Sequence, residues 1–146
     1  NATVILGDYT SINGIYIRSP GDYGVIVQTA DLRINGGYIT DAGRTAIYIS
    51  TAYTEYKAVV ISNLNIVNSG QDAAATYADI DVYHTKYIQL LGINTRGTNV
   101  NTSINFTDVT HGMLTTSWAL DKYIWSSGNV TLLEIHACKN VTAWIT

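Results

Sequence analysis

A gapless internal repeat is the feature that most constrains how this chain folds. Residues 30–43 read ADLRINGGYITDAG and residues 57–70 read KAVVISNLNIVNSG, an offset of 27 residues. The alignment matches apolar residues at three positions and glycine at a fourth: Leu32 with Val59, Ile34 with Ile61, Ile39 with Ile66 and Gly43 with Gly70. One such unit has too few apolar residues to form a core, so the units are expected to stack into a solenoid.

A third and looser copy, TKYIQLLGINTRG, runs over residues 85–97, with Ile88 and Leu90 at the paired apolar positions. A short strand rich in β-branched residues follows each copy, at residues 46–49, 79–82 and 103–106. Two further candidates for this strand are residues 24–27, before the first copy, and residues 132–135, after a diverged copy near residues 112–128. The predicted unit is therefore strand, Asn/Gly corner, strand, glycine turn and strand.

No stretch has the apolar periodicity of a helix, so the chain is predicted to be all-β. We expect a single-stranded right-handed parallel β-helix of about five coils that occupies residues 1–146 as one domain. Each strand then pairs with its equivalent one coil away, roughly 4.8 Å distant. A β-sandwich or jelly roll also has many short strands but does not by itself produce a gapless repeat. A leucine-rich repeat would require a Leu-rich consensus, which is missing.

Composition excludes several classes of protein. Charged residues make up 13 % of the chain and hydrophobic residues 47 %, which does not fit a disordered segment. A net charge of −3 leaves no basic footprint for nucleic acid, and no apolar run is long enough for membrane insertion. The single cysteine, Cys138, excludes an internal disulfide framework and a cysteine-based zinc site. Because the chain starts without Met, we expect it to be a fragment of a longer protein.

The two copies and the strand at residues 46–49 resemble the right-handed parallel β-helix proteins of the pectate-lyase-like superfamily, which includes bacteriophage tailspikes. The resemblance covers roughly residues 24–135 and concerns architecture. By analogy with tailspikes it implies a homotrimer on a virion or outside the cell. The galacturonase-type motifs Asn-Thr-Asp and Gly-His-Gly are missing, because Thr110 precedes His111-Gly112, so pectin is not indicated as the substrate.

Strand alternation predicts which side chains of the third strand face solvent. Inward-pointing residues would be Ile47, Ile49, Ile80, Val82, Ile104, Phe106, Leu133 and Ile135. Their neighbours would form an outer column of Tyr48, Asp81, Asn105 and Glu134, with Asp79 and Ser103 on one side and Ser50, Tyr83, Thr107 and His136 on the other. This surface would gather three carboxylates, an imidazole and two tyrosines in a chain otherwise poor in charge.

The carboxylates are candidate catalytic residues: Asp79, Asp81 and Glu134. Asp79 and Asp81 would lie roughly 6.5–7 Å apart on one strand face, inside the window of inverting glycosidases, whereas Asp81 and Glu134 would be about 10 Å apart. One carboxyl would need a raised pKa to donate a proton. The alternative is that they are ordinary polar residues of a solvated sheet. Calcium at the aspartate pair is a further alternative, but we expect no metal and no cofactor.

Five other side chains of this surface are candidate carbohydrate-binding residues: Tyr48, Tyr83, Asn105, Thr107 and His136. Tyrosine rings offer flat apolar faces for stacking on sugars, although they also pack against neighbouring subunits. The three tryptophans, Trp118, Trp125 and Trp144, are expected in the core, a cap or an interface.

These observations lead to three hypotheses. The first is a spike module that recognises host-surface polysaccharide, the second a glycoside hydrolase or polysaccharide lyase, and the third a purely structural shaft. Fold analogy alone does not decide between them.

Overall fold

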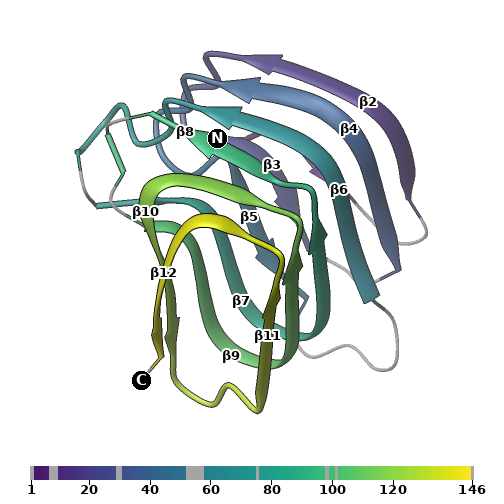
Figure 1. The fold of residues 1–146 in the computed structure, drawn as a ribbon. Coiled ribbons are helices and arrows are strands. Elements are labelled where there is room, and N and C mark those ends of the chain that lie inside the picture. Colours follow the sequence, from purple (N-terminus) through teal and green to yellow (C-terminus); the bar gives the residue numbers. More distant parts are fainter. Residues whose placement is uncertain are drawn as a thin grey trace.

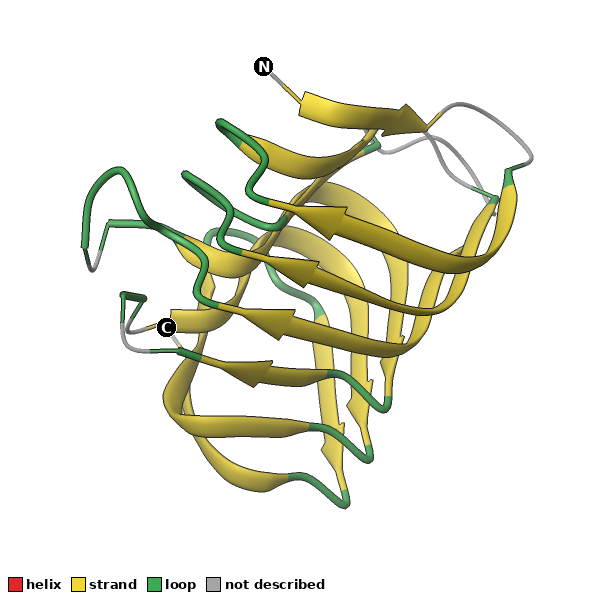
Figure 2. Cartoon of the chain, turned by 90° about the horizontal axis from the view of Figure 1, so that it is seen from above, coloured by secondary structure: helices red, strands yellow, loops and turns green. Residues whose placement is uncertain are grey.

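The computed structural model describes residues 2–6, 10–28, 31–51, 58–74, 76–97, 99–100 and 102–145. These residues form twelve β-strands and no helix (Figures 1 and 2). The strands are β1 (Ala2–Leu6), β2 (Ser11–Arg18), β3 (Tyr23–Val27), β4 (Leu32–Thr40), β5 (Ile47–Ser50), β6 (Ala58–Val67), β7 (Ala78–Leu91), β8 (Asn94–Arg96), β9 (Thr102–Thr115), β10 (Trp118–Ser127), β11 (Leu132–His136) and β12 (Lys139–Ile145).

All strand pairings are parallel, and the chain winds into a β-solenoid of about five turns, as the repeat predicts. Several long strands bend at a corner, so each turn has three faces. Face A contains the first parts of β2, β4 and β6, the second parts of β7 and β9, and β11. Face B contains the second parts of β2, β4 and β6, then β8 and the beginnings of β10 and β12. Face C contains β1, β3, β5, the first parts of β7 and β9, and the ends of β10 and β12.

The predicted repeat register is confirmed. Leu32 pairs with Val59, Ile34 with Ile61 and Ile39 with Ile66. In the third copy, Ile88 pairs with Val59 and Leu90 with Ile61. Equivalent residues of successive turns therefore lie one strand spacing apart, and the apolar repeat becomes columns of stacked side chains.

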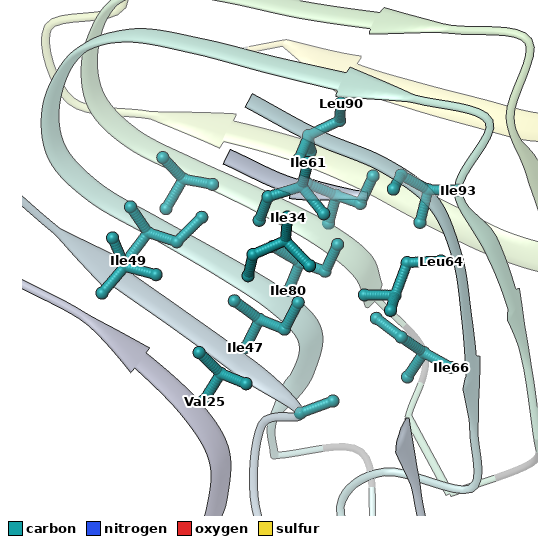
Figure 3. Packing of buried hydrophobic residues seen from close by; sticks show 14 of the residues in the cluster. Val25, Ile34, Ile47, Ile49, Ile61, Leu64, Ile66, Ile80, Leu90 and Ile93 are labelled. Carbon is teal, nitrogen blue, oxygen red and sulfur yellow. The ribbon is translucent and has the colours of Figure 1, made fainter. Parts of the chain in front are cut away.

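The core fills the space enclosed by the three faces (Figure 3). The residues predicted to point inward from β5 and from the first parts of β7 and β9 are all at most 1 % exposed: Ile47, Ile49, Ile80, Val82, Ile104 and Phe106. Figure 3 shows Ile47 and Ile80 of face C near Ile34, Ile61 and Leu90 of face A, with Leu64 and Ile66 of face B beside them. Burial of each such side chain contributes about 1.5–3 kcal/mol.

The corner between faces A and B is made by one left-handed residue in each turn. The successive residues at this corner are Gly14, Gly36, Asn63, Gly92, Thr116 and Ala137, with φ between 48° and 79°. The predicted Asn/Gly corner is thus confirmed in four turns, because Gly and Asn accept this conformation most readily. Thr116 and Ala137 adopt the same conformation at a cost of about 1–2 kcal/mol each.

The corner between faces B and C differs from turn to turn. It spans residues 19–22 between β2 and β3, residues 41–46 between β4 and β5, and residues 68–77 between β6 and β7. In the turn that contains β10, a single strand runs from face B to face C without a loop. The length of each turn is therefore set mainly outside the A–B corner.

The predicted place of the strand at residues 132–135 is wrong. β11 pairs with the second part of β9, with Glu134 opposite Met113, so it belongs to face A. Face C is continued by β10, where Ile124 lies opposite Ile104 and Trp125 opposite Asn105. Apolar and polar residues alternate in the same way on every face, so alternation does not tell which face a strand belongs to. It therefore did not reveal that β10 already occupies face C and that β11 begins the next turn on face A.

Candidate functional site

The outer surface of face C carries the predicted column over three turns. Tyr48 pairs with Asp81, and Asp81 pairs with Asn105. The next residue in this column is Trp125, in the place where Glu134 was predicted. The neighbouring column contains Ser50, Tyr83 and Thr107, as expected, followed by Ser127 in place of His136.

An open groove of about 420 Å³ lies over this surface. The residues that line it are Thr45, Thr76, Tyr77, Ala78, Asp81, Thr102, Asn105, Trp125 and Ser127. Thr45 comes from the B–C corner after β4, and Thr76 and Tyr77 from the longer corner after β6. The other residues come from β7, β9 and β10. The groove therefore exists because long B–C corners stand beside a flat sheet face.

A chain of hydrogen bonds crosses this part of face C. Asn105 Nδ2 donates to Asp81 Oδ1 at 3.0 Å and lies 3.3 Å from Thr107 Oγ1. The Thr107 hydroxyl lies 3.2 Å from the Ser127 hydroxyl. The polar side chains of three successive turns thus hold one another in place beside the groove.

Burial raises the pKa of Asp81 above its ordinary value, and the hydrogen bond from Asn105 offsets part of the shift. Burial disfavours the charged carboxylate because the groove replaces water with protein, and the amide donor stabilises that same charge. Asp81 is therefore a carboxyl that retains its proton to a higher pH than an exposed aspartate. It accepts a hydrogen bond at Oδ1 and directs its polar group toward the groove.

Two aromatic side chains border the groove. Trp125 is 40 % exposed, which is unusual for so large an apolar group. Tyr77 lies beneath the guanidinium of Arg44, whose Cζ is 5.9 Å from the centre of the ring. Arg44 is itself paired with Asp22, with Nε 3.3 Å from Oδ1. Tyr77 is thus held from outside the groove, and part of the Trp125 side chain is exposed to solvent.

The two tyrosines predicted to bind sugar lie on face C but do not line the groove. The ring of Tyr48 packs on Tyr23 at a centroid distance of 5.7 Å, and burial raises the Tyr48 pKa. The ring of Tyr83 stacks on that of His84 at a centroid distance of 3.7 Å, and His84 Nε2 lies 3.1 Å from Asp108 Oδ2. Each tyrosine ring therefore has one face covered by a neighbouring side chain of the protein.

Asp79 and Ser103 are not on the outer surface, which corrects their predicted exposure. Both are 0 % exposed, and the inward-pointing residues that follow them, Ile80 and Ile104, are at most 1 % exposed. The Ser103 hydroxyl hydrogen-bonds the Thr95 hydroxyl of face B. Strand alternation holds only after the chain has left the B–C corner, so residues at the corner itself are enclosed. Asp79 and Asp81 therefore do not form an exposed pair of carboxyls.

Glu134 and His136 lie on the outer side of face A. Glu134 Oε2 is 3.5 Å from His111 Nε2 and 3.9 Å from His136 Nε2. The structure does not bring these residues to Asp81, since they stand on a different face of the solenoid. The predicted catalytic set is thus divided among the outside of face C, the interior and face A.

Within the ranges that the structure describes, no three His, Cys, Asp or Glu side chains are grouped in a way that would hold a metal ion. The same ranges contain no helix long and apolar enough to cross a membrane.

Sequence reasoning missed the part that Trp125 plays in the groove, because the tryptophans were expected in the core, a cap or an interface. Residues 123–127 read YIWSS and do not alternate apolar with polar side chains, so the burial of Ile124 and Ser126 between more exposed neighbours is evident only in the structure. The side chain of Trp144 lies outside the described part of the chain. Comparison with protein-family models, with curated protein sequences and with solved structures finds no match to this chain.

Proposed function

We propose that this chain is a β-helical module that binds a polysaccharide in the groove of face C. The observation that supports this most is the exposed ring of Trp125 beside the hydrogen-bonded pair Asp81 and Asn105. Sugars have apolar ring faces that stack on aromatic side chains, and hydroxyls that pair with amides and carboxyls. The groove combines both kinds of surface in adjacent positions.

The flat sheet favours an elongated ligand. Asp81, Asn105 and Trp125 belong to three successive turns, each about 4.8 Å from the next. A ligand that contacts all three crosses the strands and runs along the solenoid axis. A chain of linked sugars suits this track better than a compact metabolite, because the three side chains are spread over two strand spacings along the axis.

Binding is favoured over hydrolysis by the separation of the carboxyls. Glycosidases of the common type use two carboxyl groups that flank one bond. Among the described residues that line the groove, Asp81 is the one carboxyl. Asp79 is buried and Glu134 stands on face A. A hydrolase or lyase would need a second group from elsewhere, which makes catalysis the secondary hypothesis.

The proposed setting is a homotrimeric spike on a virion or outside the cell. Its support is the resemblance to tailspikes, together with exposed aromatic residues on face B. Tyr16 is 73 % exposed and Trp118 is 43 % exposed, and large aromatic residues are enriched in interfaces between subunits. Analytical ultracentrifugation tests this part. A species of three chains supports it, and a monomer at micromolar concentration contradicts it.

The test of the binding function compares two aromatic variants. We expect Trp125→Ala to weaken binding to a responsive polysaccharide about five- to thirtyfold, since stacking on an aromatic ring contributes on the order of 1–2 kcal/mol. Tyr87→Ala is the matched control, because Tyr87 is 36 % exposed but lies on face A. Binding is measured on a glycan array and by calorimetry, with thermal melting to verify the fold.

Equal losses in the two variants would contradict the placement of the site. Release of reducing ends from the bound polysaccharide, abolished in Asp81→Asn, would instead support the enzyme. If the chain neither bound nor cleaved a polysaccharide, the third hypothesis, a purely structural shaft, would be favoured.

A further inference from the structure

The charge of the groove points to the class of sugar that it accepts. We propose that the groove selects uncharged sugars over acidic ones, with Asp81 as the residue that determines this specificity. This inference rests on the proposed function and deepens it.

The described residues that line the groove supply one acidic side chain and no basic one. The remaining polar groups are neutral: the hydroxyls of Thr45, Thr76, Tyr77, Thr102 and Ser127, the amide of Asn105 and the indole of Trp125. A uronate, sialate or sulfate needs a cationic or strongly donating partner when it leaves water. The groove presents an acidic side chain where that partner would be required.

The nearby cation, Arg44, is occupied outside the groove. Its Nε lies 3.3 Å from Asp22 Oδ1, and its guanidinium covers the ring of Tyr77. Turning Arg44 toward a ligand would break an ion pair and remove a contact that holds Tyr77. Arg44 therefore supports the wall of the groove and does not neutralise an acidic ligand.

Repulsion from Asp81 is large enough to decide the preference. Two like charges about 4 Å apart repel by about 1 kcal/mol in water, and by more near a protein surface. A tenfold difference in affinity requires only 1.4 kcal/mol. Asp81 Oδ1 already accepts a hydrogen bond from Asn105. Sugar hydroxyls meet no electrostatic repulsion, because they can donate to the other carboxyl oxygen of Asp81, Oδ2.

The experiment compares oligogalactose with oligogalacturonate, which carries a carboxylate in place of each hydroxymethyl group, by calorimetry at pH 7.5. We expect oligogalactose to bind at least tenfold more tightly. In Asp81→Asn, which keeps the shape and removes the charge, we expect the preference over oligogalacturonate to fall to within about threefold.

Tighter binding of oligogalacturonate than of oligogalactose by the wild type would overturn the inference, while binding that depends on Trp125 leaves the proposed function intact. If no oligosaccharide binds and Trp125→Ala has no effect, the proposed function fails, and the inference fails with it.

Discussion

The two corners that bound face B follow opposite rules. At the A–B corner, every turn bends at one left-handed residue, from Gly14 in the first to Ala137 in the last. At the B–C corner, the connection ranges from no loop within β10 to the segment at residues 68–77. The first corner fixes the register of the solenoid. The second adds Thr45, Thr76 and Tyr77 to the groove, which is where loops on a rigid scaffold commonly carry function.

The difference has a simple physical origin. At the A–B corner the inward residues on either side of the turn both enter the core, so any change in length moves them out of phase. In the B–C corner after β6, Gln71, Asp72 and Ala74 are exposed, so added length there costs mainly the entropy of loop closure, which grows slowly with length. Variation is therefore tolerated at one corner and excluded at the other.

The sharpest test of this contrast inserts one glycine at each corner. After Asn63, the insertion would turn Leu64 and Ile66 away from the core, and both are 0 % exposed. We expect a loss of about 3–6 kcal/mol in the free energy of unfolding. The same insertion after Ala74 should cost less than about 1 kcal/mol. Urea unfolding measures both, and equal losses would show that the two corners are equally constrained.

A smaller effect is expected from alanine at two adjacent glycines. At Gly37 a Cβ would lie 2.2 Å from the carbonyl oxygen of Ile15, and φ is +143°. At Gly36, where φ is +79°, a Cβ would meet nothing within 4 Å. Gly37→Ala should lower the free energy of unfolding by about 3 kcal/mol or more, from steric overlap added to backbone strain.

Gly36→Ala should cost only about 1–2 kcal/mol, the strain of the left-handed backbone alone. Thermal and urea unfolding of the two variants provide the comparison. If Gly36→Ala were the more damaging change, backbone conformation would outweigh the close approach of adjacent turns.

A stabilising change is expected where the A–B corner carries an unfavourable residue. Thr116 is β-branched and has φ of +48°, whereas Asn63 occupies the same corner with an amide side chain. Thr116→Asn should raise the free energy of unfolding by about 0.5–1 kcal/mol. Thr110→Asn, within β9, should instead lower it slightly, because asparagine is disfavoured in strands. A loss of stability in Thr116→Asn would mean that Thr116 makes a compensating contact.

The smallest effect concerns the pH dependence of stability at the groove. Because burial raises the Asp81 pKa, the folded chain binds this proton more tightly than the unfolded chain does. The stability of the wild type is therefore reduced as pH rises from 3.8, the ordinary pKa of an aspartate, through the raised pKa of Asp81.

Asp81→Asn removes this contribution, so its stability relative to the wild type should be greater at pH 7 than at pH 3. Denaturant unfolding of both proteins at the two pH values measures the difference. If the difference in stability between Asp81→Asn and the wild type were the same at both pH values, Asp81 would be as well solvated in the folded chain as in the unfolded chain.

Much of the solenoid was predictable from residues 30–43 and 57–70, whose equal length fixes their register without any other information. Later turns were harder to place because their lengths change: Asp41 and Asn68 stand 27 residues apart, His84 and Asp108 24, and Thr115 and His136 21. An offset of 27 residues therefore aligns the first of these pairs but not the last, whose spacing is 21 residues. This is why Glu134 and His136 were predicted on face C, and why Trp125 was missed there.

The sequence by itself determined a parallel stack of short strands, its inward residues and its left-handed corners, because these follow from local alternation, an evenly spaced repeat and the conformational freedom of Gly and Asn. Only the tertiary structure decided which side chains share a face. It enclosed Asp79, moved Glu134 to face A and placed Trp125 beside Asn105. These outcomes depend on the number of residues in each turn. That number is set by the loops, whose lengths cannot be read from the local alternation of apolar and polar residues.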